Sequence, residues 1–441
     1  MTGCPWGEVA APSRPTDPSG LRSYEVYQRL RVHEASPVIR PRQLWSAEFR
    51  DDPWPVLHAV REHTPCYRDW IGNAFWVTRY DDVTSVFVDD ANFETRTRRW
   101  SMELAHRGRD RRHEIPVTGA ETRRIDGAVE AVTARVLDAV DRTRPVDLVR
   151  EVLAPIAYDL VAEAADIPAV DRSWFVRTLL RVGRGTAWDP RWLDDARQAF
   201  DDLSRYAQEL LEARRHGDGD DVVCAIARQA AREAPATGDD VAATWCETDH
   251  DTLVGSLANL WSLLLAHPDE LARLGDDRRL WKLAWLEALR HSPPLMTASR
   301  WTRHEVERFG MLIPAGALVL CSVGAANRDP RQFADPDEFR PGRKDLCQRE
   351  ARGQYRADGL ASTISPGTGA PSRFPAVPED RPRSRFALVR DTAVTVSRQV
   401  WSWAGSLSST VQPVPGPRAV TDGGVRMCWS LPVHVGERGA R

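Results

Sequence analysis

Apolar residues three and four positions apart dominate the middle of the chain, which is the spacing of an amphipathic helix. The stretch from Glu121 to about Ser204 shows this spacing most clearly, with Val129 and Val132 on one face of the expected helix. Helical spacing continues to about residue 232. The pattern therefore predicts several consecutive helices in this part of the chain.

Two further helices are predicted before residue 293. A long apolar helix is expected from about Val241 to Ala266, after the helix-breaking and N-capping stretch "PATGDD". The stretch "DDRRLWKLAWLEALRHSPP" predicts another helix that ends at Pro293 and Pro294, because a residue before proline disfavours the helical conformation.

Alternating bulky residues predict short strands in the first and last parts of the chain. "CYRDWIGNAFWVTRY" predicts two strands around Gly72 and Asn73, and "VERFGMLIPAGALVLCSV" and "VRMCWSLPVHV" predict strands in the last third. Helical and strand-like stretches are interleaved, so we expect a mainly α protein with a minor irregular β part and a single domain over residues 41–441. The proline-rich, polar residues 1–40 are expected to form a flexible N-terminal arm.

Composition and charge narrow the class of protein. The net charge of −3 gives no overall field that would attract nucleic acid or an anionic membrane. The longest apolar stretch is too short and too rich in proline and glycine to span a bilayer, and the N-terminal sequence lacks a secretory pattern. Seven scattered cysteines without a CxxC pair argue against disulfides and against a zinc site. We therefore expect a cytoplasmic protein with no bound metal.

Glu287 and Arg290 stand three residues apart in "EALR", which places both on one face of a helix. With the following stretch up to "DEFRPGR", they resemble the ExxR helix and the segment after it in cytochrome P-450 proteins. The resemblance covers residues 45–435 and implies the cytochrome P-450 fold, a triangular helical prism with a long central helix. It also implies a buried cluster of Glu287, Arg290 and Arg340, which is costly to break because a buried charge would lose its partner.

The start of the predicted central helix carries a run of polar residues, "DHDT". In the family this helix holds an acid and an alcohol that relay protons to bound oxygen. The resemblance assigns these positions to Asp251 and Thr252, with His250 at the variable place and Asp249 replacing a small residue.

The stretch "TISPGTGAPSRFPA" resembles the family's haem-ligand loop but contains no cysteine. Aligning its glycines Gly367 and Gly369 with those of the family places Arg373 where the thiolate ligand stands. An arginine has no lone pair with which to bind iron.

A second haem contact of the family is also altered. Thr122 and Asp126 take the places of a histidine and an arginine that hold a haem propionate, whereas a third contact, Arg300, is retained. A carboxylate facing a propionate would repel it. We therefore predict that haem is absent and that Arg373, Arg300, Thr122 and Asp126 surround the vacated site.

Three functions are compatible with this interpretation. The first is a haem-free enzyme of secondary metabolism, such as antibiotic biosynthesis. It would bind a small lipophilic intermediate and catalyse cyclisation, dehydration or rearrangement with Asp249, His250, Asp251 and Thr252 as acid–base groups. The second is a non-catalytic auxiliary protein for a partner such as a glycosyltransferase, by family analogy. The third is an active monooxygenase with an unusual haem ligand.

Overall fold

The computed structural model describes residues 39–40, 42–87, 89–94, 119–184, 193–214, 217, 219–230, 236–246, 250–347, 385–404, 419–422 and 425–436. The predicted arm over residues 1–40 lies outside this part of the chain except for residues 39 and 40. The chain divides into two compact units. The first unit consists of Met1–Thr97 and Met296–Gln332, and the second of Arg98–Leu295 and Phe333–Arg441.

The first unit is built on a five-stranded sheet with the strand order β1-β2-β8-β5-β3. Its strands are β1 (Cys66–Asp69), β2 (Ala74–Val77), β3 (Phe93–Glu94), β5 (Thr297–Thr302) and β8 (Leu318–Ser322). β1 and β2 form the predicted antiparallel pair, and Asn73 in the turn between them has a φ of 46°, which asparagine tolerates well. β2 pairs in parallel with β8, so the sheet joins two segments that are far apart in sequence.

Short helices and a second hairpin complete the first unit. They are η1 (Gln43–Trp45), α2 (Ala47–Asp51), α3 (Trp54–His63), α4 (Tyr80–Phe87), α15 (Val323–Ala326) and the antiparallel pair β6 (Val306–Arg308) and β7 (Met311–Ile313). The buried carboxylate of Asp69 accepts hydrogen bonds from the indole of Trp45 at 3.1 Å and from the amides of Ile71 and Gly72 at 3.0 Å. This carboxylate therefore fixes the turn of the first hairpin.

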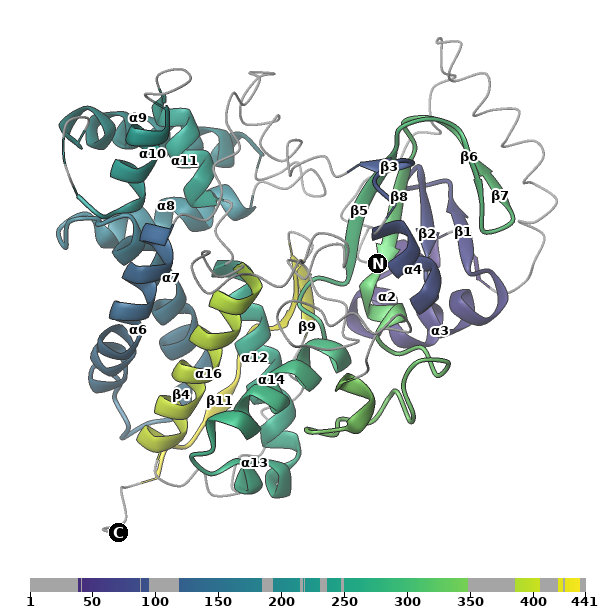
Figure 1. Ribbon diagram of the computed structural model, residues 1–441. Coiled ribbons are helices and arrows are strands. Elements are labelled where there is room, and N and C mark those ends of the chain that lie inside the picture. Colours follow the sequence, from purple (N-terminus) through teal and green to yellow (C-terminus); the bar gives the residue numbers. More distant parts are fainter. Residues whose placement is uncertain are drawn as a thin grey trace, which may run out of the picture. The chain divides into compact units, whose positions relative to one another are not determined.

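The second unit is mainly helical (Figure 1). Its helices are α6 (Gly119–Asp138), the π-helix η2 (Leu148–Leu153), α7 (Ala154–Ala164), α8 (Arg172–Arg184), α9 (Leu193–Arg214), α10 (Val222–Ala230), α11 (Gly238–Cys246), α12 (His250–Ala266), α13 (Pro268–Leu274), α14 (Arg278–His291), η4 (Lys344–Cys347) and α16 (Arg385–Ala404). Two short ribbons pair β4 (Val146–Asp147) with β11 (Pro432–Val433), and β9 (Ala419–Asp422) with β10 (Val425–Cys428). The mainly α fold class predicted from the sequence is confirmed.

The predicted helix from 241 to 266 corresponds to α11 and α12, and residues 247–249 between them lie outside the described part of the chain. Three residues of the site predicted at "DHDT", His250, Asp251 and Thr252, therefore belong to α12, and Asp249 lies outside the described residues.

One apolar core of the second unit lies among α7, α8, α9, α10 and α11. Gly238 at the start of α11 packs directly on α9: a Cβ atom there would overlap the carbonyl oxygen of Ser204 and approach the amide nitrogen of Gln208 to 2.8 Å. The absence of a side chain at Gly238 thus permits the close approach of the two helices.

The buried side chain of Asn259 fixes α12 to its neighbours. Its amide nitrogen donates to the carbonyl oxygens of Ser292 at 2.8 Å and Arg426 at 3.0 Å, and its oxygen accepts from the amide of Cys428 at 3.1 Å. These bonds connect α12 with the end of α14 and with β10, so the central helix is held firmly in its middle.

Among the described residues, no helix is long and apolar enough to cross a membrane.

Candidate functional site

The first turn of α12 carries three of the four residues predicted to transfer protons. His250 and Thr252 are buried, whereas the side chain of Asp251 is 38% exposed. A carboxylate in the first turn also suits the helix itself, because it interacts favourably with the helix dipole. The fourth residue, Asp249, lies outside the described residues.

Tyr158 of α7 joins this turn, and the sequence analysis missed it. Its hydroxyl donates to Asp251 Oδ1 at 3.4 Å, and its ring lies 5.3 Å from the His250 ring, at an angle of 52°. His250 Nε2 lies 3.5 Å from the same Oδ1 atom. Three side chains that can carry a proton therefore converge, and we refer to Tyr158, His250 and Asp251 as the α12 cluster.

The second carboxylate oxygen of Asp251 lies beside Gly183 of α8. A Cβ atom built on Gly183 would be 4.0 Å from Asp251 Oδ2, which is an ordinary contact distance. Within the described part of the chain, no hydrogen bond or ion pair is made to Oδ2. Oδ1 thus has both protein partners, whereas Oδ2 makes no polar contact within the described residues.

The predicted buried ion cluster forms around Glu287 on α14. Glu287 and Arg290 are fully buried, and two nitrogens of Arg290 each bind one carboxylate oxygen at 2.8 Å. Arg290 also donates to the carbonyl oxygens of Pro336 at 2.6 Å and Glu338 at 2.9 Å. The guanidinium group therefore holds the loop after Phe333 against α14.

The third member of this cluster is Arg343, and the prediction of Arg340 is corrected. The Arg343 side chain is 5% exposed and lies 3.4 Å from Glu287 Oε1. The Arg340 side chain is 48% exposed and pairs with Asp335 at 2.9 Å and Glu338 at 2.5 Å. Only the backbone amide of Arg340 reaches Glu287, at 2.9 Å. The loop turns between the two arginines, at Gly342 with a φ of 83°, so their side chains reach different partners.

The described structure does not test whether the residues predicted around a vacated haem site lie together. Arg373 and its loop lie outside the described residues. Thr122 is buried and Asp126 is exposed on α6 of the second unit. Arg300 belongs to β5 of the first unit, where it lies over the Phe87 ring at 4.6 Å. The predicted pocket therefore stays a prediction.

Four described thiols are buried, and burial raises the pKa of each, which disfavours the thiolate that would bind haem iron. Cys66 and Cys321 are buried in the sheet of the first unit, and burial raises the pKa of each to about 12. In the second unit, burial and a hydrogen bond to Asp221 raise the pKa of Cys224 to about 11. Burial also raises the pKa of Cys428, whose thiol donates to the Ser430 carbonyl oxygen. Cys246 at the end of α11 is partly exposed.

Four tryptophans near the central helices are buried. Trp261 of α12 and Trp281 of α14 have ring centroids 5.6 Å apart, and the indole of Trp285 donates to Ser256 Oγ at 3.1 Å. Trp245 packs edge-on against Phe175, at 5.1 Å. These rings fill space between helices of the second unit, as ordinary core residues do.

Comparisons with known proteins point to one superfamily. A family model described as cytochrome P450 matches residues 282–349. Protein AknT of Streptomyces galilaeus is 35% identical over 231 residues, which is 50% of this chain and 51% of that protein. The cytochrome P450 monooxygenase PikC of Streptomyces venezuelae is 27% identical over 332 residues, 69% of this chain and 78% of that protein.

A solved structure supports the same fold. The crystal structure of CalO2 aligns with a TM-score of 0.70 at 22% identity, covering 90% of this chain and 99% of that one. In sequence, the chain spans only about half the length of the first curated relatives that it matches.

Proposed function

The chain belongs to the cytochrome P450 superfamily, and from this premise we propose that it is a haem-free protein of bacterial natural-product biosynthesis. It binds a lipophilic intermediate and catalyses a non-oxidative acid–base step, such as cyclisation, dehydration or rearrangement. Relatives from Streptomyces, PikC among them, support the biosynthetic setting.

The observation that carries the acid–base proposal is the α12 cluster. Asp251 Oδ1 has Tyr158 and His250 within 3.5 Å, which holds the carboxylate in one orientation. Oδ2 is then directed toward the substrate and accepts or returns its proton. Because Asp251 is partly exposed while His250 is buried, the carboxylate is the group that touches the substrate. Tyr158 and His250 position it, and Thr252 borders the same turn.

The absence of haem is proposed from the chemistry of the available ligands. The stretch from Thr363 to Ala376, which resembles the haem-ligand loop, contains no cysteine. Burial raises the pKa of the thiols of Cys66, Cys224, Cys321 and Cys428, which disfavours their use as thiolate ligands. Against this proposal, PikC is named a monooxygenase, which favours a bound haem. We therefore derive no step through iron.

An absorbance spectrum of freshly purified full-length protein tests the haem-free state. We expect no Soret band, and no band near 450 nm after reduction and addition of CO. A stoichiometric Soret band would assign the chain to the haem monooxygenases and overturn the proposal.

Replacing Asp251 by Asn in the producing organism tests the acid–base step. We expect one intermediate to accumulate that is an isomer of the normal product, or differs from it by one water, as measured by mass spectrometry. Asp269→Asn on the exposed start of α13 is the matched control and should leave the product profile unchanged. An accumulated intermediate that lacks one oxygen atom would instead indicate an oxidative step.

The same variant separates catalysis from an auxiliary role. If the protein only activates a partner such as a glycosyltransferase, Asp251→Asn will support normal product formation, whereas deletion of the whole protein will abolish it. That result would contradict the acid–base proposal and support the auxiliary one.

A further inference from the structure

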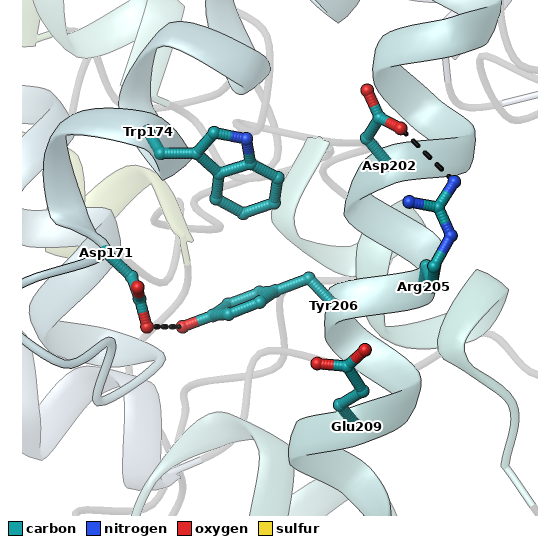
Figure 2. Close-up of a pocket in the computed structure, with 6 residues that line it drawn as sticks. All are labelled: Asp171, Trp174, Asp202, Arg205, Tyr206 and Glu209. Carbon is teal, nitrogen blue, oxygen red and sulfur yellow. Dashed lines mark hydrogen bonds and ion pairs between the residues drawn. The ribbon is translucent and has the colours of Figure 1, made fainter.

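A pocket of about 200 Å³ opens between α8 and α9 of the second unit, and none of the α12 cluster residues lines it. Figure 2 shows the six residues that line it: Asp171, Trp174, Asp202, Arg205, Tyr206 and Glu209. A single water needs roughly 10–15 Å³ of such a volume, so the space suits a small organic group.

Two aromatic rings form the body of this pocket. Trp174 and Tyr206 pack edge to face, with centroids 5.0 Å apart and an interplanar angle of 60°. In Figure 2 the Tyr206 side chain extends from α9 toward Asp171, with Trp174 on one side of it and Glu209 on the other. The faces of such rings carry negative electrostatic potential and attract cations.

A hydrogen bond to a carboxylate fixes the Tyr206 ring. Its hydroxyl donates to Asp171 Oδ2 at 2.9 Å. Burial and this hydrogen bond raise the pKa of Tyr206, so the phenol stays protonated and continues to donate at neutral pH. Because the acceptor is charged, the bond also increases electron density in the ring and strengthens its attraction for a cation.

The charges around the rings favour a cation as well. Asp202 is neutralised by Arg205 at 3.3 Å and by Arg181 at 3.9 Å, with Gln198 as a further donor at 3.1 Å. Within the described part of the chain, the carboxylates of Asp171 and Glu209 form no ion pair. Three carboxylates and one guanidinium therefore leave an excess of negative charge at the pocket.

A metal ion is not the ligand that this arrangement fits. No group of three or more carboxylate, histidine or cysteine side chains in the described ranges is arranged to hold a metal. From the aromatic walls, the uncompensated carboxylates and the volume, we propose that the α8–α9 pocket binds a small organic ammonium ion. This binding is independent of the proton transfer proposed at Asp251.

Isothermal titration of the intact chain with choline tests the proposal. We expect saturable binding of one choline, with a Kd on the order of 1 mM. The neutral isostere 3,3-dimethylbutan-1-ol should not bind, because it has the same shape without the charge. Glu209→Gln should raise the Kd about 2- to 5-fold, and Trp174→Leu about 3- to 30-fold.

Glu212→Gln is the matched control for Glu209. It removes the same charge from the same helix, but Glu212 is bonded to Gln208 at 2.7 Å and does not line the pocket. Because Glu209 and Glu212 are exposed, both variants should fold normally.

Three results would overturn the proposal. The first is equal binding of choline and its neutral isostere. The second is a Glu212→Gln variant that weakens choline binding as much as Glu209→Gln does. The third is no binding of choline at all. Binding of a lysine-rich peptide without binding of choline would assign the pocket to a protein side chain instead.

Discussion

At the scale of single residues, two arginines three positions apart have different roles. Arg343 is buried against Glu287, whereas Arg340 is exposed and pairs with surface carboxylates. We expect Arg343→Ala to lower the free energy of unfolding by about 3–5 kcal/mol, because it leaves buried charge without its partner. Arg340→Ala should cost at most about 1 kcal/mol. Urea unfolding of both variants measures the difference.

Equal effects of these two variants would contradict the assignment of Arg343. Arg340→Ala is a fair control because its backbone amide still reaches Glu287 after the side chain is removed.

Glu62 in the first unit is expected to give a pH-dependent contribution to stability. Hydrogen bonds from Arg331 hold its pKa at about 2, below the ordinary 4.5. Its contribution is therefore complete above pH 4.5 and is lost as the pH falls toward 2. Because the pair is partly exposed, Glu62→Gln should cost only about 0.2–1 kcal/mol at pH 7.

Unfolding curves at pH 7 and pH 2 check this prediction. The stability difference between wild type and Glu62→Gln should disappear at the lower pH. Glu307→Gln, an exposed change in the same unit, should show no such trend. A difference that persists at pH 2 would rule out Glu62 as its source.

Spacing in the sequence predicted some of the site residues and not others. Glu287 and Arg290 belong to one helix, so their spacing of three residues was enough to predict that their side chains lie on the same face. Choosing Arg343 over Arg340 depended on how a loop packs, which spacing does not encode. Tyr158 lies 93 positions from Asp251, and only the packing of α7 against α12 brings them together.

At the scale of elements, the contact between α9 and α11 depends on Gly238. We expect Gly238→Ala to lower the melting temperature by several degrees, because its Cβ would overlap backbone atoms of α9 that cannot move independently. Gly127→Ala is the control: no atom lies within 4 Å of the added Cβ. It should stabilise α6 by about 0.5–1 kcal/mol.

Thermal unfolding followed by circular dichroism distinguishes the two variants. We expect the melting temperature to fall for Gly238→Ala and to rise for Gly127→Ala. An unchanged melting temperature for Gly238→Ala would show that α11 can shift without a loss of stability.

Most elements were predictable because their apolar spacing was long and regular. The hairpin of β1 and β2 and the helices α6 to α10 follow the pattern directly. The apolar spacing also predicted α11 and α12 on either side of residues 247–249, which lie outside the described part of the chain. Sequence reasoning also gave no sign of the parallel pairing between β2 and β8, which depends on tertiary structure.

At the scale of the whole molecule, the first unit is assembled from two distant segments. We expect residues 1–97 alone to lack a stable sheet. Both β5 and β8 come from the second segment, and in the described sheet β8 is the strand that pairs with β2 on the side opposite β1. Joining residues 1–97 to 296–332 through a flexible linker should restore cooperative unfolding. Circular dichroism of both fragments measures this, and a folded 1–97 fragment would contradict it.

The pairing of β2 with β8 also has a consequence for synthesis on the ribosome. The hairpin of β1 and β2 leaves the ribosome long before its partner strand exists, so one edge of β2 stays open while the helical unit is translated. The unpaired backbone groups along this edge can form hydrogen bonds with strands of other nascent chains. The nascent chain is therefore most prone to aggregation during this interval. We expect chaperones to bind mainly to its first hundred or so residues.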